Sequence, residues 1–405
     1  MKLHQNIVQL IHQTLDKIFN EHELSDKIVP KILQQKILGS RDRKLIASTI
    51  YDIVRWKRKY EFIYHQLNIN VDKNDALIAI SLIARNIVID NLSILSIDNA
   101  IVENIEKNIS TKILDESINN SYDENLYNYI LESLGSEWHE VAQTLNTVAP
   151  VYLYINPKKI TVPNFTKELD KLNIEYEIPN YPSFIQKENW NCIKINSQQN
   201  LKNTNFFKEY FFSFQDFGSQ CIGILFYQYI DKKEKTKILD YCAGHGGKTF
   251  QITNMLKSSN TQLFATDFNP KRLHKLKQNI KNKSITILDF NDVSAQQYNM
   301  ILIDAPCSGT GTFRRQPDLK YNLSIASIED KIKIQHQVLV DAASYLLPNG
   351  IIVYATCSIL PQENQLQIKV FLDAHKTFNL VEEHILLPST YNTDGFYMCV
   401  LKKIV

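Results

Sequence analysis

The sequence predicts a multidomain protein: an all-α N-terminal domain, a small α+β domain and a C-terminal doubly wound α/β domain. Three observations indicate this. Apolar residues recur at helical spacing in the first third, prolines crowd the segment after residue 149, and short apolar runs alternate with helical stretches beyond residue 215. With 405 residues, 44% of them hydrophobic, the chain has material for two or three cores. We place the domains at residues 1–130, 140–205 and 206–405.

The N-terminal part has the periodicity of amphipathic helices. In "RKLIASTIYDIVRWKRKYEFIYHQL" (residues 43–67), the residues that repeat at three to four positions or their multiples are Leu45, Thr49, Ile53, Tyr60, Ile63 and Leu67. The four cations in "RWKRKY" (residues 55–60) have two interpretations, a solvated helix face or a surface for RNA phosphates. The polar stretch "DESINNSYDENLY" (residues 115–127) predicts a linker.

Charge and cysteine content limit the classes of function. Lys and Arg total 45 against 43 for Asp and Glu, so a nucleic-acid surface requires local clustering of cations. The first residues lack the features of a signal peptide, and no apolar run is long enough for a bilayer span. We therefore expect a cytoplasmic protein with no membrane partner. The six cysteines should be reduced thiols, and because none has zinc-site spacing we expect no metal.

Two patterns follow the N-terminal domain. Prolines and short β-like runs such as "VYLYIN" predict the small mixed domain, which ends before Gln215. From there "KILDY", "QLFATD", "SITILD", "NMILID" and "GIIVYAT" alternate with helical stretches, which is typical of βαβ units and a parallel sheet. Ligands of such sheets bind at the carboxyl ends of the strands.

The stretch "ILDYCAGHGGKT" (residues 238–249) has the order strand, glycine turn, helix. Gly244, Gly246 and Gly247 let the backbone approach a ligand closely, and the start of the helix offers free N–H groups. This loop alone fits several nucleotide cofactors. Asp267 ends the next apolar run, where an acid accepts hydrogen bonds from ribose hydroxyls. Asp289 ends the run after that, where the adenine end of a cofactor would lie.

Two cysteines stand just beyond the ends of apolar runs, Cys307 in "DAPCSG" and Cys357 in "YATCS". We expect the strands that end at Asp304 and Thr356 to be neighbours, so that both thiols face one pocket. Addition of a thiolate to carbon 6 of a pyrimidine turns carbon 5 into an enamine carbon that can attack an electrophilic methyl group. Asp304 is placed to assist at ring N3, and a second thiol suits product release. Chemistry alone leaves open which cysteine attacks.

The long motifs "DYCAGHGGKT", "DAPCSGTGTFRRQPDLKY" and "YATCSILPQENQLQIKVFL" closely resemble those of the bacterial Fmu/Sun family of 16S rRNA (cytosine-5) methyltransferases, which use S-adenosylmethionine. "DGFYMCVLKK" and "SFQDFGSQ" resemble that family too. "RDRKLIASTIYDIVRWKRK" is similar to the NusB-type RNA-binding domain that precedes the catalytic domain. The resemblance implies a Rossmann-like methyltransferase domain. It also implies that the partner is RNA, in particular 16S rRNA, and that the cofactor is S-adenosylmethionine. We expect a monomer.

The resemblance also implies roles for individual residues. Cys357 would be the nucleophile, Cys307 would help to release the product, and Asp304 would serve both catalysis and the cofactor. The implied S-adenosylmethionine site is lined by Cys242, Ala243, Gly244, His245, Gly246, Gly247, Lys248, Asp267, Asp289 and Asp304.

The chain departs from the family pattern at two places. The family's loop commonly reads Ala-Ala-Pro-Gly-Gly, whereas Gly244 and His245 stand in its middle here. His245 would either face solvent or touch the methionine carboxylate. Tyr154 stands where the family usually has an arginine.

Two other functions stay open. One is a tRNA cytosine-5 methyltransferase, and the other is a non-catalytic RNA-binding assembly factor that keeps the fold. Asp304, Cys307 and Cys357 favour an enzyme, because a binding module has no use for two such thiols.

Overall fold

The computed structural model describes residues 3–34, 38–196, 201, 204–231, 233–256, 260–280 and 284–404. The chain forms two compact units, one made of Met1–Val148 with Thr312–Ile325 and the other of Ala149–Gly311 with Ala326–Val405. The division into three domains at residues 1–130, 140–205 and 206–405 stays a prediction. Within the described ranges, no helix combines the length and apolar character that crossing a membrane requires.

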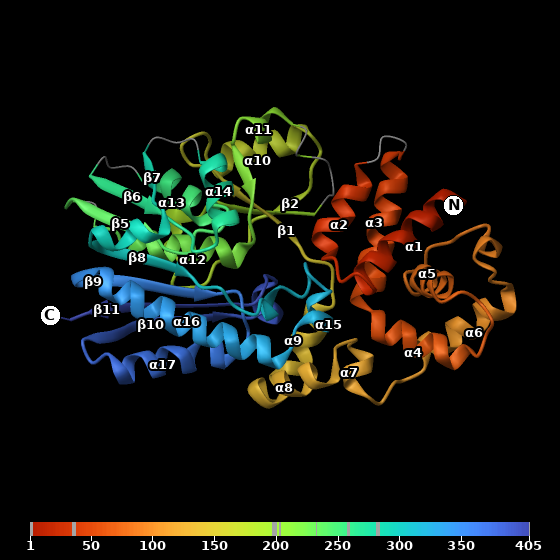
Figure 1. The fold of residues 1–405 in the computed structure, drawn as a ribbon. Helices are drawn as coiled ribbons and strands as arrows, with labels where there is room; N and C mark the ends of the chain where they lie inside the picture. Colours follow the sequence, from red (N-terminus) through yellow and green to blue (C-terminus); the bar gives the residue numbers. More distant parts are fainter. Residues whose placement is uncertain are drawn as a thin grey trace. The chain divides into compact units, whose positions relative to one another are not determined.

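The first unit is helical; its residues up to 148 are drawn from red to gold in Figure 1, and its segment Thr312–Ile325, which carries α15, is drawn in cyan to blue. Its elements are α1 (Gln5–Phe19), α2 (Ser25–Leu33), α3 (Ser40–Arg55), α4 (Lys57–Leu67), α5 (Lys73–Ala84), η1 (Leu92–Leu95), α6 (Asn99–Ser110), α7 (Glu116–Asn119), α8 (Glu124–Leu134), α9 (Glu137–Leu145) and α15 (Leu319–Asn322). The periodic residues predicted for 43–67 are all buried. They lie on two helices, because the chain leaves helical geometry at Trp56.

The linker predicted for residues 115–127 was wrong, because these residues form α7 and the start of α8. Asp115 accepts hydrogen bonds from the backbone N–H groups of Ser117 and Ile118, and Asp123 accepts one from Leu126. Carboxylates at this position satisfy the first free N–H groups of a helix. The polar residues that suggested a linker are therefore helix caps.

The cations of "RWKRKY" are engaged inside the helical unit. The buried guanidinium of Arg55 donates to the carbonyl of Arg314 at 3.0 Å. Arg58 donates to the carbonyl of Tyr122 at 2.6 Å. Lys59 donates to Asn119 Oδ1 at 3.2 Å. These three side chains therefore help to hold the unit together, and the RNA-phosphate interpretation of this stretch stays a prediction.

The segment Thr312–Ile325 is fastened to the helical unit by a buried lysine. Lys320 Nζ donates to the carbonyls of Arg55 at 2.8 Å and Asn120 at 3.1 Å, and to Asn146 Oδ1 at 2.6 Å. The ammonium also lies 4.2 Å from the centre of the Tyr122 ring. Burial, and next the positive charge of Arg55, lower the pKa of Lys320 well below its usual value. The "FRRQPDLKY" motif therefore contributes to the helical fold.

The second unit begins with a small antiparallel sheet in the order β2-β3-β1-β4. Its elements are β1 (Val151–Ile155), α10 (Val162–Lys171), β2 (Tyr176–Glu177), η2 (Lys187–Asn189), β3 (Cys192–Ile195), α11 (Asn205–Lys208) and β4 (Phe212–Phe214). Leu153 and Ile193 pack with Phe165 of α10 on one face of this sheet. Tyr152 and Cys192, which alternate with them, join the core of the larger sheet.

In the described part of the second unit, seven strands form a sheet in the order β10-β11-β9-β8-β5-β6-β7 (Figure 1). Its elements are α12 (Phe217–Gln228), β5 (Thr236–Asp240), α13 (Gly247–Met255), β6 (Thr261–Ala265), α14 (Pro270–Asn279), β7 (Ile285–Ile287), η4 (Phe290–Ala295), β8 (Tyr298–Asp304), η5 (Thr310–Thr312), α16 (Ile325–Tyr345), β9 (Leu346–Thr356), η6 (Pro361–Glu363), α17 (Gln365–Ala374), β10 (Phe378–Leu386), α18 (Pro388–Tyr391) and β11 (Phe396–Lys403). Strands β5 to β9 are parallel, and β11 is antiparallel to both of its neighbours.

Successive residues of the parallel strands point into two separate cores. Ile238 of β5 and Leu302 of β8 pack with α12, α13 and α14, whereas Leu239 and Ile303 pack with α16 and α17. A sheet covered on both faces explains why these strands are continuous apolar runs. The fold class predicted for this part of the chain is confirmed. The strand order reverses between β5 and β8, which places a ligand crevice at their carboxyl ends.

Candidate active site

The loop between β5 and α13 leaves space for a ligand. Gly244 and Gly246 have φ values of +58° and +89°, a region that side chains with a Cβ rarely adopt. A Cβ on Gly244 would meet no atom within 4 Å, so the backbone there borders open space. A Cβ on Gly246 would lie 2.9 Å from Leu276. His245 is exposed, which fits both alternatives given for this residue.

Asp267 shapes this loop from the end of β6. Its side chain is buried, with 1% of the residue exposed. One carboxylate oxygen accepts the N–H of Gly244 at 2.9 Å, and the other accepts the N–H of Asn269 at 2.8 Å. The predicted hydrogen bond to ribose would add to these two contacts and stays a prediction.

Two aromatic side chains follow the acids at the ends of β6 and β7. Asp289 is 63% exposed at its side chain and pairs with Lys277 at 2.7 Å. Phe268 and Phe290, the residues directly after Asp267 and Asp289, are also exposed. Phe290 stacks on Tyr241 with 5.6 Å between ring centres. Neither ring was among the predicted site residues, although an aromatic residue directly follows each acid in the sequence.

A buried carboxylate lies beneath the glycine loop. Oδ2 of Asp240 accepts the hydroxyl of Thr249 at 2.6 Å. Oδ1 is buried and accepts no hydrogen bond from any residue in the described ranges. Burial raises the pKa of Asp240 to about 7. An unpaired buried oxygen is costly, so this atom suits a donor that a ligand brings.

Lys248 and Asp304 form an ion pair at the carboxyl ends of β5 and β8. Nζ of Lys248 lies 2.7 Å from Oδ2 of Asp304, with the lysine side chain 10% and the aspartate side chain 35% exposed. Burial by itself lowers the pKa of Lys248, but the charge and hydrogen bond of Asp304 outweigh it, so the pKa is raised. The lysine therefore keeps its charge beside the crevice.

The structure brings Cys307 and Cys357 together. Strands β8 and β9 are parallel neighbours with Asp304 opposite Ala355, as predicted. The two sulfur atoms are 3.3 Å apart, and both cysteines are partly exposed. Cys192, Cys221, Cys242 and Cys399 are buried thiols, and burial raises the pKa of each. The hydrogen bond to Cys357, followed by burial, raises the pKa of Cys307 and keeps it protonated.

A polar network that the sequence analysis did not identify supports both cysteine loops. The buried carboxylate of Glu363 accepts hydrogen bonds from the N–H of Ser308 and from Gln335 Nε2, at 2.8 and 2.9 Å. The hydroxyls of Thr310 and Ser358, one from each loop, are 3.0 Å apart. No local pattern distinguishes these polar residues from surface ones.

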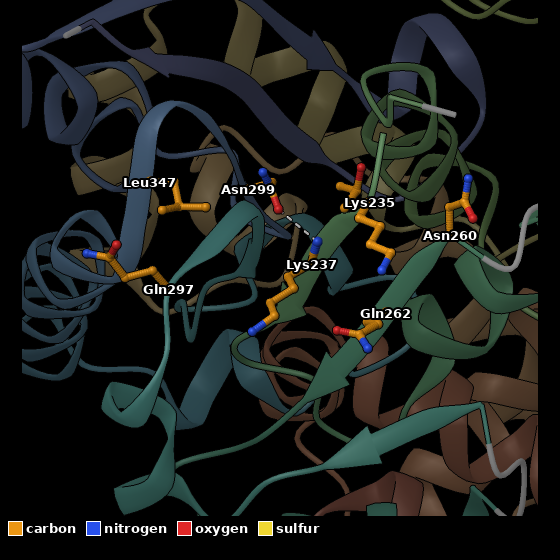
Figure 2. A pocket seen from close by; sticks show the side chains of 8 residues that line it. Lys235, Lys237, Asn260, Gln262, Gln297, Asn299 and Leu347 are labelled. Atoms are coloured by element: carbon orange, nitrogen blue, oxygen red, sulfur yellow. Dashed lines mark hydrogen bonds between the residues drawn. The ribbon is translucent and has the colours of Figure 1, made fainter. Parts of the chain in front are cut away.

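A cavity of about 500 Å³ lies at the opposite end of the strands from the cysteines (Figure 2). It is lined by Lys235, Thr236, Lys237, Asn260, Gln262, Gln297, Asn299 and Leu347. These residues surround the amino ends of β5, β6 and β8. Figure 2 shows the hydrogen bond there from the N–H of Lys237 to Asn299 Oδ1, 2.8 Å long. This cavity is separate from the cysteines, which lie at the carboxyl ends.

Comparisons with known proteins agree with this geometry. Residues 227–402 match the family model described as 16S rRNA methyltransferase RsmB/F. The chain is 29% identical to ribosomal RNA small subunit methyltransferase B of Shewanella oneidensis, over 91% of this chain and 93% of that protein. It is 31% identical to the protein of the same name from Vibrio cholerae, over 69% of this chain and 64% of that protein. The crystal structure of PH0851 is similar in fold, with a TM-score of 0.74, 20% identity and complete coverage of both chains.

The resemblance noted in the motifs is thus confirmed over the part of the chain that carries the glycine loop and both cysteines. Residues 227–402 of this chain therefore form a methyltransferase domain that matches the 16S rRNA methyltransferase RsmB/F family model.

Proposed function

We propose that this protein methylates carbon 5 of a cytosine in 16S rRNA through a transient covalent bond between Cys357 and carbon 6. One observation carries the proposal: two partly exposed thiols lie 3.3 Å apart at the ends of neighbouring strands. The names of the matched family and relatives support 16S rRNA over tRNA as the substrate.

The residues around the glycine loop fit S-adenosylmethionine. The free Oδ1 of Asp240 suits its ammonium group, and Asp267 suits its ribose hydroxyls. Phe268 and Phe290 offer exposed rings beside the two strand ends, where an adenine can stack. Bound there, S-adenosylmethionine supplies an electrophilic methyl group.

Attack begins at Cys357. Its thiolate forms the S–C6 bond, and the electrons of the C5=C6 double bond move toward N3, which takes a proton held between Lys248 and Asp304. The 2.7 Å contact between these two side chains keeps that proton next to the carboxylate. The resulting enamine would then use its electron pair to form the bond from carbon 5 to the methyl group, and the bond from that methyl group to the cofactor's sulfur would break with its electron pair left on the sulfur.

Release requires a base and a leaving group. Once Cys357 is bonded to carbon 6, it no longer accepts the hydrogen bond that keeps the proton on Cys307. Cys307 then loses its proton to water more easily, and the resulting thiolate takes the proton from carbon 5. The C5–H electron pair re-forms the double bond as the S–C6 bond breaks, and that bonding pair returns to Cys357. N3 gives its proton back to the Lys248–Asp304 pair, so that neutral 5-methylcytosine leaves.

The test is methylation mapping with purified protein, S-adenosylmethionine, and either 16S rRNA or tRNA stripped of modifications. We expect bisulfite sequencing to find a protected cytosine in 16S rRNA. The target should lie in an unpaired or opened segment, because the reaction needs the base out of its stack. Protection only in tRNA would favour the tRNA alternative. Binding of both ligands without any methylation would favour the assembly factor.

A further inference from the structure

Cys307 is held from both sides by two buried polar residues. Gln335 Nε2, from α16, donates to the carbonyl of Pro306 at 3.0 Å. The same nitrogen donates to Glu363 Oε1 at 2.9 Å, and that carboxylate accepts from the N–H and the hydroxyl of Ser308. The residues before and after Cys307 are therefore tied to one buried pair.

Glu363 also belongs to the loop that carries Cys357. It ends η6, six residues after Cys357, and its backbone carbonyl accepts the hydroxyl of Tyr354 in β9 at 2.9 Å. A single residue thus connects the two loops on which the thiols stand. Neither its side chain nor that of Gln335 is exposed, so neither contacts solvent or a bound base.

The charges around the two thiols are unequal. The groups that act on Cys307 are Cys357, Glu363 and the N–H of Gly309, and the negative charge of Glu363 adds to the effects that raise the pKa of Cys307. The charged Lys248 instead interacts with Cys357. Negative charge disfavours a thiolate and positive charge favours it.

We propose that Glu363 is a positioning residue that gives the two cysteines different roles, by fastening the Cys307 loop beside Cys357 and by holding negative charge next to Cys307. This inference rests on the proposed function, because nucleophile and release residue are the roles assigned there. Cys307 stays a thiol in the free enzyme, and in the adduct the same charge makes it a stronger base.

The charge is tested without RNA, by measuring how fast iodoacetamide alkylates Cys307 at a series of pH values. Peptide mapping by mass spectrometry follows Cys307 alone, in a Cys357→Ala background. Glu363→Gln removes the charge, and its amide can still accept from Ser308 N–H and Gln335. We expect the midpoint of the rate–pH profile to move to lower pH, where each unit corresponds to about tenfold more thiolate. The matched control is Glu382→Gln, which changes a carboxylate on β10 that accepts a hydrogen bond from the hydroxyl of Tyr229. An unchanged midpoint in Glu363→Gln would overturn the electrostatic part.

Ser308→Ala tests the fastening and does not depend on the folding of the Glu363 variant. It removes one hydrogen bond to Glu363 but leaves the charge in place. We expect kcat to fall several-fold with KM for RNA unchanged, and the midpoint for Cys307 to stay where it is. Wild-type kcat in Ser308→Ala would overturn the positioning role. If 16S rRNA proves not to be the substrate, the alkylation result still decides whether Glu363 separates the two thiols.

Discussion

Lys248 and Lys320 are both buried, but their pKa values shift in opposite directions. Lys248, in the α/β unit, faces the carboxylate of Asp304 and has a raised pKa. Lys320, in the helical unit, donates to three neutral oxygens and has a lowered pKa. The first is a charge kept beside a reaction crevice, and the second is a hydrogen-bond donor that organises a fold. The comparison shows that the charge of the hydrogen-bond partners, more than burial, decides whether a buried lysine keeps its positive charge.

Lys320→Met should have the largest effect on stability. Methionine fills a similar volume but donates nothing, so buried carbonyl and amide oxygens lose their donor. We expect a loss of about 2–4 kcal/mol in the free energy of unfolding, measured by urea denaturation. Lys333→Met, an exposed lysine on α16, is the control and should change little. Equal stability of the two variants would contradict the claim that Lys320 stabilises the helical unit.

Lys248→Met should leave the fold nearly intact and lower the activity. Asp304 is partly exposed, so water can solvate it once the lysine is gone. We expect methyl transfer to fall by about a hundredfold or more, because the proton for N3 loses its source. If Lys248→Met unfolds as easily as Lys320→Met, the two lysines do not differ in the way we infer.

Asp267→Asn tests a second residue that, like Lys248, is assigned to the reaction site and not to the fold. An amide keeps one acceptor for the N–H of Gly244 or Asn269 but presents a donor at the other. We expect S-adenosylmethionine to bind more weakly by about 1.5–3 kcal/mol in titration calorimetry, since a charged acceptor is lost. Asp289→Asn, at an exposed side chain, should weaken binding less. Unchanged Kd in Asp267→Asn would remove the ribose assignment.

The smallest effect is the change in the free energy of unfolding per pH unit that Lys320 causes. The folded-state pKa of Lys320 lies below that of an unfolded lysine, so the unfolded chain binds more protons between the two values. Stability from this group therefore rises with pH until the ordinary lysine pKa, by up to about 1.4 kcal/mol per unit. We expect the wild type to gain stability relative to Lys320→Met as pH rises toward 10. A parallel pH dependence of the two proteins would contradict the lowered pKa.

The parallel sheet could be predicted from the sequence because its strands are buried on both faces and so appear as continuous apolar runs. The pairing of β8 with β9 followed from the order of motifs, and it brought Cys307 to Cys357. In the helical part, the period of Leu45 to Leu67 predicted helices correctly, but not the break at Trp56, where no glycine or proline marks the end.

Other features depend on contacts between distant residues. Lys320 bonds the carbonyl of Arg55, which lies 265 positions away, so no local signal separates it from a surface lysine. Glu363 meets Gln335 only when α16 packs beside η6. Asp115 and Asp123 looked like linker residues because the same short polar side chains serve in loops and in helix caps.

The most direct test of the central claim is a denaturing gel of labelled 16S rRNA incubated with S-adenosylmethionine and each cysteine variant. Cys357→Ala removes the nucleophile, so we expect neither methylation nor a protein–RNA adduct. Cys307→Ala still attacks and transfers the methyl group but stalls at elimination, so a slowly migrating adduct should accumulate, and the double variant should lose it. An adduct in Cys357→Ala that is absent from Cys307→Ala would reverse the two roles. Wild-type methylation in both single variants would contradict the covalent mechanism.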